Sequence, residues 1–237
     1  MVSGTMVDKF WQYTAVMLVA AMASQVVQAE ETLIPNFEVG GSLGVLSHEQ
    51  LHGLDVTINM PLSNNFTTQL SVNSDYAITQ PGSNGYSQSE LIGNAFVRNV
   101  QGKFGVGLGY QEKKPNDATK AKESTSIVRV FIDLYLKKFT LIAKATEYEE
   151  RIATTASSSL GVAYYANDEH RLSLIKQRRT VGDVWQFEAI FQPEEYQQQG
   201  SLGMQIQQAP DTVYWGLLAN FYFDTRMTLK QRYRHYH

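Results

Sequence analysis

The sequence has no cysteine among its 237 residues, and no long hydrophobic run follows position 29. Without cysteine there can be no disulfide bond, which suits a cell-envelope protein that does not depend on disulfides. Without a long apolar run, no segment after position 29 could cross a bilayer as a helix. The net charge is only -3, with no basic excess, so nucleic acid is a poor candidate for a partner.

Helical periodicity is also lacking, because no segment keeps its apolar residues at a spacing of 3.6 positions. Apolar residues instead recur at every second position, most clearly from Thr212 to Phe223. A period of two is that of a strand, whose successive side chains point to opposite faces. This segment is about as long as the 9–11 residues that a tilted strand needs to cross a hydrocarbon layer. Its apolar face, aromatic near both ends, consists of Val213, Trp215, Leu217, Ala219, Phe221 and Phe223.

The same alternation recurs along the chain and predicts about thirteen strands. They cover residues 34–46, 54–60, 66–76, 90–98, 103–111, 126–137, 139–148, 157–166, 171–178, 184–192, 201–207, 212–223 and 226–237. Single-chain bacterial membrane barrels have an even number of strands, so one segment is false or one strand is missed. The weakest candidates are 171–178, 201–207 and 226–237. We predict twelve strands, with fourteen as the second choice.

The connections between these segments alternate in length. The long connections follow residues 76, 111 and 149, whereas most of those in between take two to five residues. Outer-membrane barrels have long outer loops and short periplasmic turns, so the first strand should run outward. The longest loop is expected at 112–125, where Lys, Asp and Glu predict a solvated excursion. The Gly-x-Gly-x-Gly at 105–109 is not a phosphate-binding loop, because its glycines keep the strand period and no helix follows.

With these segments, the chain resembles the outer-membrane β-barrel proteins of Gram-negative bacteria, and in particular porin-like ones. The resemblance covers residues 34–237 and implies an all-β fold, a single antiparallel up-and-down transmembrane barrel. With 43% hydrophobic and 18% charged residues, composition alone would indicate a soluble protein, but lumen-facing polar residues dilute the hydropathy of membrane barrels. Leu229 to Arg234 looks like the closing strand of such proteins, which commonly ends Tyr-x-Phe, although His235 stands in place of Phe. Alternatively, this segment is a basic tail and Phe221-Tyr222-Phe223 ends the barrel.

The N-terminus resembles a signal peptide. Lys9 precedes an apolar run from Tyr13 to Ala23, and Val27-Gln28-Ala29 offers small or medium residues where a signal peptidase cleaves. We predict cleavage after Ala29, which makes residues 1–29 the signal peptide and 30–237 the barrel domain in the outer membrane. The alternative is a membrane anchor, but the run is shorter than the ~20 residues that a spanning helix needs.

The inward faces of the predicted strands carry charges of both signs. Such groups can line the constriction of a pore, or they can pair with one another and plug it. Inward glycines at positions 40, 44, 105, 107 and 109 leave room either for a passage or for tyrosines packing from across, namely Tyr135, Tyr148, Tyr214 and Tyr222. The inward charged residues are Glu38, Asp55, Glu90, Arg98, Lys103, Arg129, Asp133, Lys144 and Glu188. Our candidates for pore-lining residues are Arg98, Lys103, Arg129, Asp133, Lys144 and Glu188.

We therefore predict a small channel for passive diffusion of small polar or charged solutes, and not an enzyme. The resemblance implies surrounding outer-membrane lipid and lipopolysaccharide as partners, and the barrel-assembly machinery during biogenesis. Alternatives are a non-conducting barrel that binds through loops such as 112–125, and an exported soluble β-sandwich, which the aromatic residues near the ends of the apolar faces disfavour.

A further alternative is an enzyme acting at the outer rim of the barrel. Barrel chemistry of this kind needs a nucleophile or a cluster of carboxylates and histidines. The residues that could form such a cluster are His48, Glu49, His52, Asp75, Tyr76, Glu112 and Glu150. No pair of histidines has metal-ligand spacing with a supporting third ligand, so we assign no catalytic residue, metal or cofactor.

Overall fold

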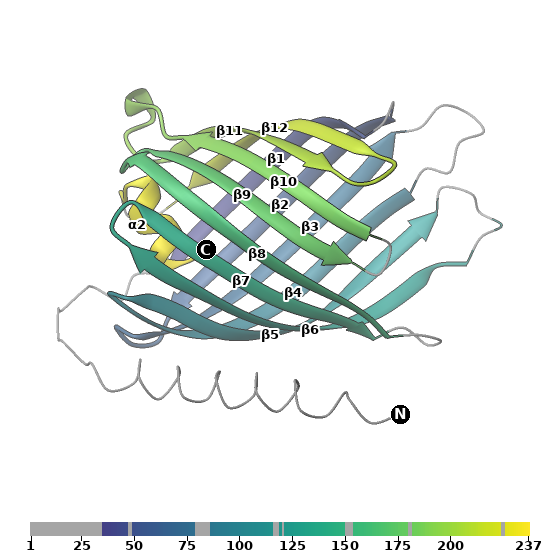
Figure 1. The fold of residues 1–237 in the computed structure, drawn as a ribbon, viewed down its shortest axis with the longest axis horizontal. Coiled ribbons are helices and arrows are strands. Elements are labelled where there is room, and N and C mark those ends of the chain that lie inside the picture. The colour runs from purple at the N-terminus through teal and green to yellow at the C-terminus, as the bar shows by residue number, and fades with distance from the viewer. Residues whose placement is uncertain are drawn as a thin grey trace.

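The computed structural model describes residues 35–46, 49–78, 86–115, 119, 121–149, 154–179, 182–223 and 226–237. These form a closed antiparallel barrel of 12 strands, in which each strand pairs with the next and β12 pairs with β1 (Figure 1). The strands are β1 Asn36–Leu46, β2 Glu49–Pro61, β3 Phe66–Ile78, β4 Tyr86–Asn99, β5 Gly102–Pro115, β6 Glu123–Leu136, β7 Phe139–Glu149, β8 Thr154–Asn167, β9 His170–Arg179, β10 Gly182–Phe191, β11 Gly200–Gln208 and β12 Val213–Tyr222. The predicted signal peptide lies outside the described residues.

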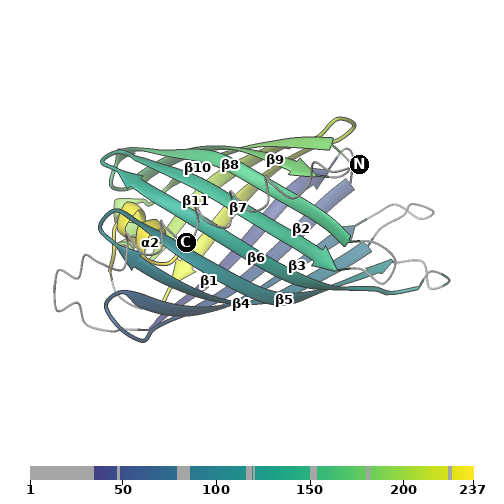
Figure 2. The same ribbon diagram turned by 60° about the horizontal axis from the view of Figure 1, so that its bottom comes forward.

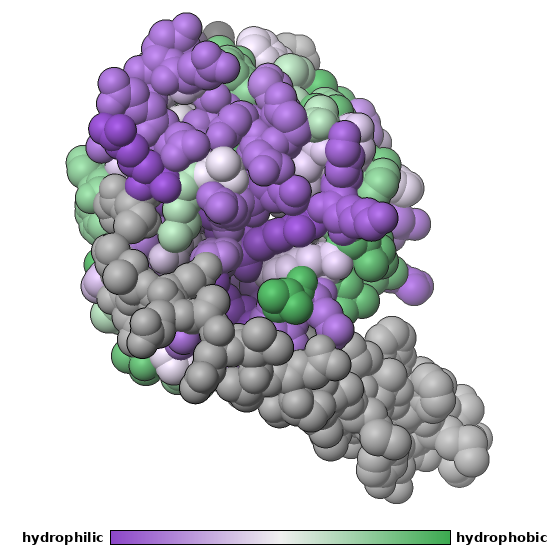
Figure 3. All heavy atoms as spheres, turned by 90° about the vertical axis from the view of Figure 1, so that its left-hand side faces the viewer, coloured by the Kyte–Doolittle hydropathy of each residue, from purple (hydrophilic) through white to green (hydrophobic). Residues whose placement is uncertain are grey.

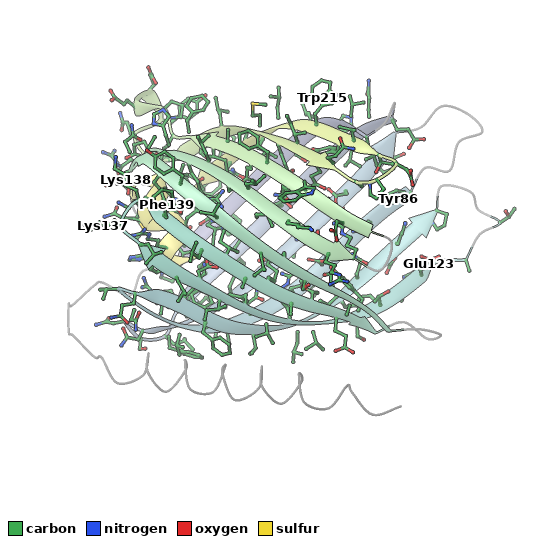
Figure 4. All side chains as sticks on the ribbon, in the orientation of Figure 1. Tyr86, Glu123, Lys137, Lys138, Phe139 and Trp215 are labelled. Atoms are coloured by element: carbon green, nitrogen blue, oxygen red, sulfur yellow. The ribbon has the colours of Figure 1, made fainter. Side chains whose placement is uncertain are left out.

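The alternation of apolar and polar residues sorts the side chains between the two sides of the wall. Leu43, Leu108 and Leu217 point outward and are 60%, 68% and 62% exposed, whereas Ile92 and Ile127 on the inner side are buried. Trp215, near the end of β12, also points away from the barrel (Figure 4). The predicted facing of β12 is therefore correct, because one face of each strand contacts the interior and the other does not.

The predicted number of twelve strands is confirmed, and two of the three weakest segments are genuine strands. Segment 171–178 lies in β9 and segment 201–207 in β11. The prediction was wrong for 226–237, which contains α2 (Leu229–His235) instead of a closing strand. Because β12 already pairs with β1 from Leu46↔Tyr214 to Glu38↔Tyr222, no free strand edge remains for a further strand. The second alternative, a basic tail after Phe221-Tyr222-Phe223, therefore fits the structure.

The N-terminus of α2 has a local cause in the sequence. The Thr228 side chain accepts a hydrogen bond from the Gln231 backbone N–H, and the Gln231 side chain accepts one from the Thr228 N–H. This reciprocal capping box satisfies two of the donors that a helix start leaves free. The expectation that the chain contains no helix was therefore wrong. A second short helix, the 3-10 helix η1 (Glu194–Tyr196), lies between β10 and β11.

Half of the expected long loop at 112–125 is strand. β5 continues to Pro115 and β6 begins at Glu123, with Lys113 paired to Glu123 across the ladder. The side chains of Lys122 and Glu112 form an ion pair at the end of this hairpin. Charged composition was misleading here because ladder hydrogen bonds join backbone groups, so a hairpin can extend into polar sequence once its register is set. Only residues 116–122 connect the two strands.

The two ends of the barrel differ. One end, called here the short-turn end, carries the connections 62–65, 100–101, 137–138, 168–169 and 192–199, and β1 begins and β12 ends there. Helix α2 lies at this end, and the β3–β4 and β5–β6 hairpins join at the other (Figures 1 and 2). Lys137, Lys138 and Phe139 mark the short-turn end, and Tyr86 and Glu123 mark the opposite end (Figure 4). Among the described residues, no helix has both the length and the apolar character needed to cross a bilayer.

Candidate functional site: a polar lumen closed by a helix

The inner wall of the barrel carries charges that are largely separated by sign. The carboxylates Glu38, Asp55, Asp75 and Glu90 stand on the neighbouring strands β1 to β4. The cations Lys103, Arg129, Lys144 and Arg171 stand on β5, β6, β7 and β9. Because successive strands follow one another around a closed barrel, this order places the two sets on different sides of the lumen.

Several of the predicted pore-lining residues pair with one another or with neighbours. Lys103 is 1% exposed, and its Nζ lies 3.1 Å from the Asp133 carboxylate. Arg129 Nη2 lies 3.5 Å from Glu90 Oε1. Glu188 forms an ion pair with Arg171, a residue that the sequence did not single out. Pairing therefore neutralises part of the inner wall, which is one of the two outcomes left open by the sequence.

The other two predicted residues are differently placed. Lys144 stands on the inner face of β7, opposite Phe131 of β6 and Ser159 of β8, and its side chain is exposed within the lumen. Arg98 lies near the end of β4, opposite Lys103, and is half-buried. All six predicted residues are on the inner face, at different depths along the barrel.

The room left by inward glycines is filled with side chains from adjacent strands. A Cβ on Gly105 would lie 2.6 Å from the Cβ of Phe96, whose ring packs edge-on against Phe131 with 6.0 Å between centroids. At Gly44, a Cβ would lie 2.7 Å from Cζ of Tyr214. The packing interpretation therefore holds at both positions. Tyr214 is one of the predicted tyrosines, but phenylalanines from β4 and β6 take the space beside Gly105.

Helix α2 lies inside the short-turn end, and side chains of the wall bind its backbone. Gln69 of β3 donates a hydrogen bond of 2.8 Å from Nε2 to the carbonyl of Tyr236. Lys103 of β5 donates one of 3.4 Å from Nζ to the carbonyl of Tyr233. The Tyr135 hydroxyl of β6 donates to the carbonyl of Arg234. These bonds satisfy carbonyl groups at the C-terminal end of the helix, which a helix leaves without internal partners.

The side chains of the C-terminal segment are also bound by the wall. Arg232 is fully buried, with Nη1 3.5 Å from Glu38 Oε1 and its guanidinium carbon 3.7 Å from the centre of the Tyr222 ring. The other oxygen of Glu38 lies 2.7 Å from Nε2 of His237. Glu38 thus holds the segment through both of its carboxylate oxygens.

A second cation–π contact joins the helix to β9. The Arg171 guanidinium carbon lies 4.0 Å from the centre of the Tyr233 ring. Burial, with a further contribution from the Glu188 carboxylate, raises the pKa of the Tyr233 phenol well above its usual range, so the phenol stays neutral. Its neutrality allows the ring to remain beside these charged groups.

Contacts on opposite sides of the barrel show that the helix bridges the lumen. Glu38 and Tyr222 belong to β1 and β12, whereas Arg234 Nη2 donates to the carbonyls of Lys137 and Phe139 at the turn between β6 and β7, at 2.8 and 3.1 Å. In a twelve-strand barrel these two pairs of strands face each other across the axis. Hydrophilic side chains crowd this end of the molecule, and apolar ones gather on its flanks (Figure 3).

A polar cavity of about 290 Å³ remains between the C-terminal segment and one side of the wall. Tyr233 and His237 of the segment line it together with Glu38, Asp55 and Glu188 of the strands. The arrangement is therefore a polar lumen that the helix bridges at the short-turn end, with a polar cavity beside the helix.

The sequence contained a signal for this helix that strand periodicity obscured. Leu229, Arg232 and Tyr236 are all buried, and their spacing of three and four positions is that of one helix face. Together with the Thr228 and Gln231 capping box, this spacing distinguishes the segment from a strand.

The possible rim cluster of an enzyme is not assembled among the described residues. His52 pairs with Leu43, so both lie on the outer face of the barrel, whereas Asp75 pairs with Gly53 and faces the lumen with Glu49. Two other members of the cluster, His48 and Glu150, lie outside the described residues. The described part of the chain also contains no group of three or more His, Asp or Glu residues placed to hold a metal ion.

Comparisons with known proteins identify the fold. No family model matches the sequence, and no curated protein matches it either. Among solved structures, the KdgM porin is similar with a TM-score of 0.58 at 8% identity, over 79% of this chain and 99% of that one. The COG4313 outer membrane channel from Pseudomonas putida F1 gives 0.54 at 9%, over 84% and 100%. Outer membrane phospholipase A from Escherichia coli gives 0.51 at 9%, over 79% and 95%. The chain thus has the fold of bacterial outer-membrane barrels, a fold that both channels and an enzyme use.

Proposed function

We propose that this chain is an outer-membrane channel that admits small polar or charged solutes by passive diffusion and is closed at its short-turn end in the state described here. The observation that carries the proposal is the uneven distribution of charge around the lumen, with most carboxylates on β1 to β4 and most cations on β5 to β9, apart from Arg98 of β4 and Asp133 of β6. Opposed charges along a water-filled passage orient and select polar solutes. The neighbouring folds include a porin and a channel, which supports the same function.

The proposal includes a place and an orientation for the barrel. The signal peptide at 1–29 would direct export, and outer-membrane lipid and lipopolysaccharide would surround the apolar outer face. Both ends of the barrel wall, the start of β1 and the end of β12, lie at the short-turn end. This end would face the periplasm, as short turns do in bacterial barrels. Solutes would then enter at the opposite end and meet the closed helix last.

Ion selectivity tests the proposal, because charged side chains beside the permeation path bias the passage of ions. The double variant Arg129→Glu with Lys144→Glu reverses two positive charges on the inner face. We expect its reversal potential in a salt gradient across a planar bilayer to shift toward that of a cation-selective channel. Lys176→Glu is the matched control, because Lys176 pairs with Asp183 and lies over Trp185 on the outer face. A double variant with the reversal potential of the control would remove Arg129 and Lys144 from the pore.

A second function, a non-conducting binding barrel, is favoured by one specific observation, the helix that bridges the lumen. In that case the polar cavity beside Tyr233 would be the bottom of a blind pocket open only toward the end of the barrel opposite α2. Planar-bilayer recording separates the two functions, because a blind barrel conducts in none of its variants.

A further inference from the structure

We infer that residues 226–237, called here the plug, form a displaceable gate that closes the channel from its short-turn end; this inference rests on the proposed channel function. The inference rests on three features of the plug. The plug is covalently attached to the barrel, it is cationic, and the barrel wall that surrounds it is closed without it.

The barrel does not need the plug for its own closure. β1 and β12 pair directly over nine residue pairs, so the sheet has no open edge for the plug to cover. The plug forms no strand, and its backbone groups bond to wall side chains and to the turn carbonyl of Asp168. Leaving the seat would therefore break no ladder hydrogen bond.

The charged groups of the seat also keep partners of their own. Lys103 remains paired with Asp133, and Arg171 remains paired with Glu188, whether or not the plug is present. Two carboxylates differ, since their cationic partners come from the plug: the exposed Asp168, which pairs with Lys230, and the buried Glu38, which pairs with Arg232 and His237. Removal of a partner from a buried charge is costly mainly when the charge is left uncompensated. The Glu38 carboxylate, called here the latch, is therefore the buried wall group that holds the plug by charge. Water would reach this carboxylate once the plug leaves.

The plug is a cationic segment that depends on its seat. It carries Arg226, Lys230, Arg232 and Arg234 and contains no Asp or Glu. Helix α2 has only seven residues, and a helix of this length is marginal in water on its own. Once released, the segment would lose its helical form and leave the mouth of the barrel as an extended chain tethered to β12.

A disulfide tether tests the gate in the full chain. Lys230 lies beside Asp168, with its backbone N 2.9 Å from the Asp168 carbonyl oxygen and its Nζ 2.9 Å from Oδ1. This contact brings the two Cα atoms within the range of a disulfide. Because the chain has no native cysteine, the variant Asp168→Cys with Lys230→Cys forms one defined bond. We expect the oxidised protein to stay closed in bilayer recordings and the reduced protein to open as the unmodified chain does.

A charge reversal tests the latch without a tether. Arg232→Glu places a second carboxylate against Glu38, and we expect the open probability to rise about tenfold or more, because a broken buried ion pair is strongly unfavourable. Arg226→Glu is the matched control, since it makes the same change of charge in the plug at an exposed residue whose guanidinium bonds to the neutral side chain of Gln197. Migration of unheated protein on a gel shows whether each variant has folded.

The outcomes separate the gate from the channel. The gate is supported if the oxidised double-cysteine variant does not conduct and the Arg232→Glu variant has a raised open probability. If the oxidised tether conducts like the unmodified chain, or if Arg232→Glu and Arg226→Glu have the same open probability, the gate is overturned while the channel stands. If no variant conducts although all are folded, the channel is overturned and the gate with it.

Discussion

At the scale of single residues, the lumen combines paired and exposed charges. Lys103 and Asp133 form a buried ion pair beside the plug, whereas the Lys144 side chain is exposed to the lumen. A buried ion pair adds little to the stability of the folded state compared with apolar residues in the same place. The loss of one partner, however, leaves an isolated buried charge that destabilises the fold. The residues of this wall therefore divide into those that hold the structure together and those that solutes could meet.

Asp133→Asn should destabilise the barrel by roughly 3–5 kcal/mol, because it leaves Lys103 charged and buried without its partner. The double variant Lys103→Met with Asp133→Leu removes both charges and should recover most of that loss. The free energy of unfolding in urea, followed by tryptophan fluorescence in lipid vesicles, measures both effects. Asp183→Asn, which removes the exposed partner of Lys176, is the control and should change stability by less than about 1 kcal/mol. Equal losses in the single and double variants would contradict this account of the pair.

At the scale of elements, twelve strands keep one period and one helix departs from it. The strands alternate because each separates an interior from an exterior, and this constraint is the same for β1 as for β12. The C-terminal segment has no such constraint, since wall side chains surround it on both sides, and its buried residues follow a helical spacing. The segment with the helical period is thus the one that lies inside the barrel instead of in its wall.

The facing of the strands can be tested at Leu108, which is 68% exposed on the outer face of β5. Leu108→Arg should lower the free energy of unfolding in vesicles by roughly 2–4 kcal/mol if this position lies at the bilayer midplane. Leu108→Ile should be tolerated, because it keeps an apolar side chain toward the lipid. Ile132→Arg and Leu217→Arg are expected to behave like Leu108→Arg. A harmless Arg at all three positions would mean that the outer face does not contact hydrocarbon.

At the scale of the whole molecule, closure of the sheet decides how the protein behaves. With β12 paired to β1, every strand has two neighbours and the sheet has no edge. Backbone groups paired in this way can lie in hydrocarbon, where water cannot replace a missing hydrogen bond. The fold is therefore suited to a bilayer, and its polar lumen is suited to the proposed passage, which the plug would gate.

Heat-modifiability tests this molecular picture in cells. After fractionation of the cell envelope, we expect the protein in the outer-membrane fraction, with different gel migration before and after boiling, because a closed barrel resists detergent until it is heated. The signal peptide prediction is tested in the same sample, since the mature protein should begin at Glu30 in N-terminal sequencing. A soluble periplasmic protein that migrates identically with and without boiling would be incompatible with the membrane assignment.

The sequence by itself determined the strands, their number within one and the side of the wall to which each residue belongs. These features are local, because every strand is exposed to the same two environments and repeats the same period of two. Only the tertiary structure decided which charges meet. Arg232 reaches Glu38 across 194 positions of sequence, and Arg129 reaches Glu90 across 39. Such distances follow from closure of the barrel and from the fold of its last residues, so strand periodicity could not show that the lumen ends at a seated helix.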